Sequence, residues 1–195
     1  MSISSKLKIS FAALINIFMV AGCKFNDKEK KPDIVNDKAG ETTNKYNALR
    51  QQAFTVTTEN LGITLKDSLE VYGLIMDWGI DDEVATVVSY ASGDASLYLS
   101  SGGGIIGGGS HENIDVAAKG LVYEANHYLK GNDTTVEKFA LPGKDEVFFY
   151  FITQKGVYMK HDNMTNLENR TSEVQFLFDK GNIVLEQLRL IGDNY

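Results

Sequence analysis

The chain has 195 residues, of which 43% are hydrophobic and 23% are charged, and it contains one cysteine and two prolines. This composition excludes a disulfide-stapled miniprotein, because one thiol cannot close a bridge within the chain. It also excludes a disordered chain, because aromatic residues alone make up 10% of the sequence. The formal net charge of -7, from 19 basic and 26 acidic residues, argues against nucleic acid as a partner.

The amino-terminal segment has the features of an export signal. Lys6 and Lys8 precede an apolar stretch over residues 9–21, and the only cysteine, Cys23, follows this stretch closely. The stretch is too short for a comfortable membrane-spanning helix, which needs about 20 apolar residues. We therefore interpret residues 1–22 as a signal peptide.

The end of this signal resembles the lipobox of bacterial lipoproteins, with Val20, Ala21, Gly22 and Cys23. In that family the small residues fit the signal peptidase, and the cysteine receives a lipid such as palmitate before cleavage. The resemblance implies that Cys23 is the first mature residue and anchors the protein to a membrane. Each acyl CH₂ buried in the bilayer stabilises membrane binding by about 0.8 kcal/mol, so several acyl chains would hold the protein at the membrane. By the same resemblance, Lys24 favours delivery to the outer membrane of the cell envelope.

Two further regions follow the signal. Residues 23–42 carry alternating charges with few large apolar groups, which predicts a flexible tether. Residues 43–195 have the length of a single folded domain and contain no cysteine, so packing rather than disulfide bonds must stabilise this domain.

Hydrophobic periodicity predicts an α+β domain. Residues 43–54 place Tyr46, Leu49, Arg50 and Ala53 at helical spacing. Three strands are expected next, at 69–78, 83–91 and 95–100, with turns at 79–82 and 92–94. The first of these strands is apolar on both faces, which predicts a central strand covered on both sides.

The second half repeats this alternation of helix and strands. An apolar stripe over 112–130 predicts the clearest helix, and 146–153 with 157–161 form a second buried hairpin. Residues 172–191 fit a helix, although Asp179-Lys180-Gly181-Asn182 within them would also suit a hairpin turn. We favour the helix.

The order helix, three strands, helix, two strands, helix resembles the roadblock and profilin-like group. This resemblance implies a five-stranded antiparallel sheet sandwiched by about three helices. The run WGIDDEVATVVSYASGDASLYLSSGGGIIGGG, residues 78–109, also resembles a family of uncharacterised bacterial proteins. Neither resemblance implies an activity, because a fold does not determine a function.

A glycine-rich segment between the third strand and the second helix is the main candidate site. Gly102, Gly104 and Gly107 match a G-x-G-x-x-G pattern, and Ser110 and His111 follow at the helix start. Backbone amides there can approach a phosphate or another ligand. However, six glycines in eight positions match such patterns by chance, and no Lys-Ser/Thr follows. We favour a structural reading, a tight strand-to-helix crossing, over a ligand, partner or nucleotide surface.

Other chemical candidates are weaker. Glu124 and His127 have the i, i+3 spacing of half a di-metal site, but the sequence has no second such pair. Asp77 lies inside an apolar strand, where a raised pKa would suit a catalytic acid, although such a residue more often bonds turn amides. No metal, no cofactor and no complete catalytic set is expected, so an enzymatic activity is the less favoured interpretation.

The sequence therefore predicts a lipid-anchored, non-enzymatic binding or accessory module with a protein partner in the envelope. The alternative is a ligand-binding sensor or enzyme that uses the glycine-rich segment 102–109 and His111.

Overall fold

The computed structural model describes residues 33–34 and 39–192, with side chains from residue 43 onward. One antiparallel sheet forms its centre, in the strand order β1-β5-β4-β3-β2-β6-β7. The strands are β1 (Asp33–Ile34), β2 (Gly73–Ile80), β3 (Glu83–Tyr90), β4 (Ala95–Leu99), β5 (Gly104–Ile106), β6 (Glu146–Thr153) and β7 (Gly156–Asn163). The helices are α2 (Ala39–Phe54), α3 (Thr58–Leu61), α4 (Glu112–Ala125), α5 (Met164–Glu168) and α6 (Gln175–Gly192). The predicted α+β class is confirmed.

The sheet is wider than the five strands that the sequence predicted. Six strands have three or more residues, and the two-residue β1 pairs with the outer edge of β5. The additional strand β5 lies within the segment interpreted as a crossing, where Ile105 pairs with Leu97 of β4. Three residues between glycines are too few to show the alternation that marks a strand, so the pattern missed it.

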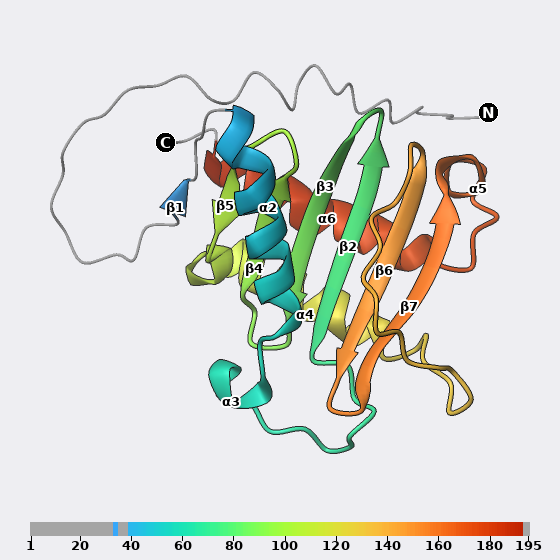
Figure 1. Cartoon of the computed structure of the whole chain (residues 1–195). Helices are drawn as coiled ribbons and strands as arrows, with labels where there is room; N and C mark the ends of the chain where they lie inside the picture. The colour runs from blue at the N-terminus through green and yellow to red at the C-terminus, as the bar shows by residue number, and fades with distance from the viewer. Residues whose placement is uncertain (1–32, 35–38, 193–195) are drawn as a thin grey trace, which may run out of the picture.

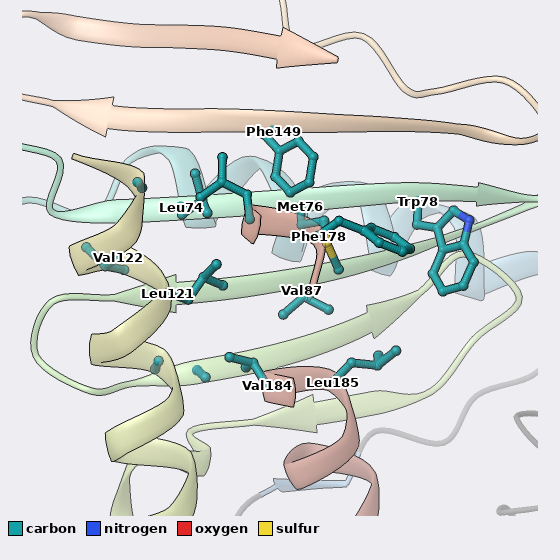
Figure 2. Packing of buried hydrophobic residues seen from close by; sticks show 14 of the residues in the cluster. Leu74, Met76, Trp78, Val87, Leu121, Val122, Phe149, Phe178, Val184 and Leu185 are labelled. Carbon is teal, nitrogen blue, oxygen red and sulfur yellow. The ribbon is translucent and has the colours of Figure 1, made fainter. Parts of the chain in front are cut away.

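Helices cover both faces of the sheet (Figure 1). Helix α2 lies over one face, while α4 and α6 pack side by side over the other face. On the α4–α6 side, Leu74, Met76 and Phe149 of the central strands point toward Leu121 and Val184 of the helices (Figure 2). Strands covered on both sides are buried along nearly their whole length, as the two-sided apolar patterns predicted.

The opposite face carries a second hydrophobic cluster. Ile75, Val88 and Tyr150 from the sheet pack against Tyr46 and Phe54 of α2. The segment between α2 and β2 and the segment between α4 and β6 extend this cover, because Leu61 and Phe139 also contact the cluster. In the part of the chain that the structure describes, no helix is both long and apolar enough to cross a bilayer.

Several element boundaries differ from the predicted ones, including those of β2, which spans Gly73–Ile80 rather than 69–78, and β7, which spans Gly156–Asn163 rather than 157–161. Helix α4 ends at Ala125 rather than Lys130. The side chain of Asn126 accepts a hydrogen bond from the Val71 amide, 2.8 Å, and donates to the Val122 carbonyl oxygen, 3.0 Å, which ends the helix locally. Helix α2 begins at Ala39, inside the segment 23–42 that was expected to be a tether.

The ambiguous segment 172–191 is helical from Gln175 onward, as favoured, and this part forms most of α6. Gly181, which suggested a hairpin turn, instead lies in the middle of the helix. A Cβ atom at this position would lie 2.5 Å from Sδ of Met76, so the glycine lets α6 approach β2 closely. The glycine therefore reflects helix–sheet packing rather than a turn.

Candidate functional site

The first two glycines of the predicted site close the β4–β5 hairpin. The Gly102 amide donates to the Leu99 carbonyl oxygen, 2.9 Å, and the Leu99 amide donates to the Gly103 carbonyl oxygen, 3.2 Å. Both glycines have positive φ, +107° and +85°, a backbone conformation that L side chains rarely adopt. Gly102 and Gly103 are therefore explained by the backbone conformation of the β4–β5 turn.

The remaining glycines sit where side chains would collide or where φ is positive. Gly104 has φ +150°, and a Cβ atom there would lie 2.2 Å from the Leu97 carbonyl oxygen. Cβ atoms on Gly108 and Gly109 would lie 2.8 Å from Leu188 and 2.6 Å from Asp94. Close packing explains these three positions, as the structural interpretation of the segment requires.

Gly104→Ala is expected to lower the free energy of unfolding by clearly more than about 1 kcal/mol, because positive φ and a backbone collision coincide. Gly107→Ala, with φ +75° but open space, should cost about 1 kcal/mol. Gly131→Ala, exposed and without positive φ, is the control and should change stability by less than about 0.5 kcal/mol. Urea unfolding of the three variants measures this order. Equal losses at Gly104 and Gly131 would contradict it.

Ser110 and His111 follow the glycines at which a side chain would collide, and they lie at the start of α4. Ser110 is exposed and His111 is half-buried. His111 is the N-cap residue, but its side chain makes no capping hydrogen bond, while its carbonyl oxygen accepts from the Ile114 and Asp115 amides. Gly107 is exposed nearby, whereas Gly104 is buried inside β5. The structure thus separates the predicted site into an exposed helix start and a buried strand.

A buried ion pair, which the sequence analysis did not predict, is the strongest polar feature of the described residues. Arg50 of α2 donates to Oδ2 of Asp77 in β2 from Nε, 3.0 Å, and from Nη2, 2.6 Å. The two side chains are 5% and 0% exposed. Burial raises the pKa of the Asp77 carboxyl above its ordinary value, against the opposing effect of Arg50 and Thr86. The carboxyl bonds no turn amide, so that expectation for Asp77 was wrong.

The remaining polar atoms around this pair also have partners. Thr86 Oγ1 donates to Asp77 Oδ1, 2.5 Å, and therefore accepts from the Tyr46 hydroxyl, 2.9 Å. Arg50 also donates to the carbonyl oxygens of Phe139 and Ala140, each at 3.0 Å. The network joins α2, two central strands and the segment before β6. With no exposed surface on the carboxylate, the arrangement suits a structural role rather than contact with a substrate.

Buried tyrosines beside this network make stability sensitive to alkaline pH. Burial and the charge of Asp77 raise the pKa of Tyr150 to about 12, and burial raises the pKa of Tyr46 and Tyr90. Since the unfolded value is about 10, the folded state favours the neutral phenol, and this stability is lost as pH rises from about 10 through 12. Tyrosinate absorbance from these buried tyrosines and circular dichroism should therefore change together above pH 10. Full titration of all tyrosines with native dichroism would contradict this expectation.

The histidines are spread over separate parts of the fold. His127 Nδ1 lies 3.9 Å from Glu124 Oε1, with its side chain 58% exposed. His161 packs its ring against Phe148 on the adjacent strand, with ring centres 5.6 Å apart. Within residues 33–34 and 39–192, no three His, Cys, Asp or Glu side chains are grouped so that they could hold a metal ion. Cys23, the residue that the lipobox resemblance predicts as the lipid-attachment site, lies outside the described residues.

No protein-family model matches the chain, and no curated protein or solved structure is significantly similar to it. The α+β architecture and the buried ion pair are observed in the described residues, whereas the lipobox resemblance is carried by the sequence alone.

Proposed function

We propose that this protein is a lipid-anchored, non-enzymatic binding or accessory module of the bacterial cell envelope. The observation that carries the proposal is Val20-Ala21-Gly22-Cys23 at the end of an export signal, with the only cysteine of the chain at the cleavage point. Lipid on Cys23 would hold the domain at the membrane. By the lipoprotein resemblance, Lys24 after the cysteine favours sorting of the protein to the outer membrane. Its fold belongs, in this proposal, to the roadblock and profilin-like group, which the two-sided helical cover of the sheet supports.

The polar groups of the described domain also support a non-enzymatic role. The best-organised titratable pair, Arg50 and Asp77, is enclosed and bonded to main-chain and side-chain partners. Two of the histidines lie in separate parts of the fold, His127 beside Glu124 on α4 and His161 against Phe148 on the sheet. A membrane-held protein of this kind would act through its surface, on an envelope protein partner.

Labelling with palmitate tests the anchor. Wild-type protein should incorporate the label, and Cys23→Ser should remove it and leave an unprocessed or mis-sorted precursor. Ser5→Ala, in the same signal but outside the lipobox, is the matched control and should be labelled normally. Label that persists on the Cys23→Ser variant would overturn the proposal.

The second candidate function is a ligand-binding sensor or enzyme that uses the start of α4. The observation that favours it is the side chain of His111, which occupies an N-cap position without capping the helix, next to exposed Ser110. Affinity capture from mildly solubilised envelope distinguishes a role for these residues. A partner lost by the Ser110→Ala/His111→Ala variant at unchanged melting temperature would show that the start of α4 takes part in binding, as this function requires, and equal capture would oppose any role for these two residues.

A further inference from the structure

The outward face of α6 carries an exposed apolar stripe. Phe176 and Ile183 are seven residues apart and are 64% and 49% exposed, and Leu190, half exposed, continues the spacing. Seven residues bring a helical side chain back to nearly the same direction, so these side chains form one line along the helix. The opposite side of α6 packs in the core through Leu177, Val184 and Leu188. The stripe therefore points away from the sheet.

Helix α4 extends this apolar surface. It packs beside α6 on the same face of the sheet (Figure 1), and its Val116 and Tyr123, again seven residues apart, are 63% and 70% exposed. Among the described residues, five of the six large exposed hydrophobic side chains lie on these two helices. Single exposed apolar residues are ordinary, but such a concentration on one layer indicates a contact surface.

The charges beside the stripe indicate what contacts it. Asp179 and Lys180 lie four and three residues before Ile183, so they project about 40° to one side of the stripe and about 60° to the other. When two copies of α6 pack in parallel, each Asp179 faces Lys180 of the second copy. In the antiparallel arrangement Asp179 would face Glu186 of the second copy, which repels it. The helix is therefore self-complementary in the parallel arrangement only.

The ion pairs and the exposure of Asp179 and Lys180 within one chain are consistent with such pairing between two copies. Asp179 is held by Arg170, 2.9 Å, and by Gln175, 3.0 Å, and its side chain keeps 38% of its surface exposed. Lys180 forms no ion pair with another residue of the described part of the chain. A second Asp179 would give it a partner.

We infer that the outward face of α6, extended by α4, is the contact surface of a parallel homodimer. Ile183 and Phe176 lie against their equivalents, and Asp179 pairs with Lys180 of the second copy on both flanks. An anionic membrane surface fits less well, because Glu112, Glu124 and Glu186 are carried by the same two helices. The inference concerns the folded domain and does not depend on lipid at Cys23.

Cysteine cross-linking tests both the contact and its direction. In the full-length chain in a bacterial envelope, Phe176→Cys should give a disulfide-linked dimer on mild oxidation, because the two positions meet only in the parallel arrangement. Leu141→Cys, an exposed residue of the segment between α4 and β6, is the matched control and should stay monomeric. The wild-type chain controls for cross-linking through Cys23.

Charge reversal supplies a second test on the Phe176→Cys background. Lys180→Glu should lower the cross-linked yield about five-fold or more, because two attractive pairs become repulsive. Asp179→Lys combined with Lys180→Glu should restore the yield. Circular dichroism and melting temperature confirm that each variant is folded. No dimer from folded Phe176→Cys protein, or a cross-link to a different protein, would overturn the inference.

Discussion

Arg50→Ala is expected to lower the free energy of unfolding by about 3–5 kcal/mol, the cost of leaving one partner of a buried ion pair behind. Asp77 would then be either an unpaired buried charge or a carboxyl that must take up a proton. The Phe139 carbonyl oxygen would also lose its Arg50 donor, while the Ala140 carbonyl oxygen would keep only the hydrogen bond from the Tyr150 hydroxyl. Urea unfolding followed by circular dichroism measures the loss.

Arg170→Ala is the matched control for this prediction. Arg170 pairs with Asp179 at a similar distance, 2.9 Å, but the two side chains are 62% and 38% exposed. Water screens such a pair, so its loss should cost less than about 1 kcal/mol. Replacing both buried partners, as Arg50→Met with Asp77→Leu, should recover much of the stability, because no charge remains buried. Similar losses of unfolding free energy for Arg50→Ala and Arg170→Ala would show that burial does not determine how much the Arg50–Asp77 pair stabilises the fold.

Phe149→Ala should also lower the free energy of unfolding by about 3–5 kcal/mol. Phe149 lies on β6, is fully buried, and fills the layer between the sheet and the α4–α6 helices (Figure 2). Removing the ring takes away its apolar burial and leaves a cavity that the two helices can close only in part.

Phe148→Ala compares the same change on the other face of the same strand. Phe148 is only partly buried, beside Tyr150 and His161, so its truncation should cost clearly less. Thermal and urea unfolding of both variants give the comparison. A loss below 1 kcal/mol for Phe149→Ala would be incompatible with a ring enclosed in the central layer.

The long apolar runs allowed the main elements of the fold to be predicted. The run EVFFYFIT gives β6 at its exact predicted bounds, because turn residues flank a two-sided apolar segment. Strand β5 was missed because its three residues are too short for a pattern, and its position depends on pairing with β4. The concentration of glycines indicated a segment with close backbone approaches, but only the three-dimensional packing distinguishes a collision at Gly104 from an open position at Gly107.

The buried ion pair shows which part of the candidate site the sequence could not predict, namely the pairing of its residues. Arg50 already stood on the inward stripe of a predicted helix, and Asp77 stood inside an apolar strand. Each was a charge at a buried position, and together they were a signal for a salt bridge. Their pairing across 27 residues depends on how α2 crosses the sheet, which periodicity does not specify.

The intact mass of the protein extracted from a bacterial envelope tests the lipid anchor most directly. Removing 22 of the 195 residues leaves 173, so the proposal predicts the mass of a chain that begins at Cys23 plus a diacylglycerol and its further acyl group. Digestion should place the whole added mass on the amino-terminal peptide. A full-length chain, or a processed chain with an unmodified thiol at Cys23, would contradict the lipid-anchored module.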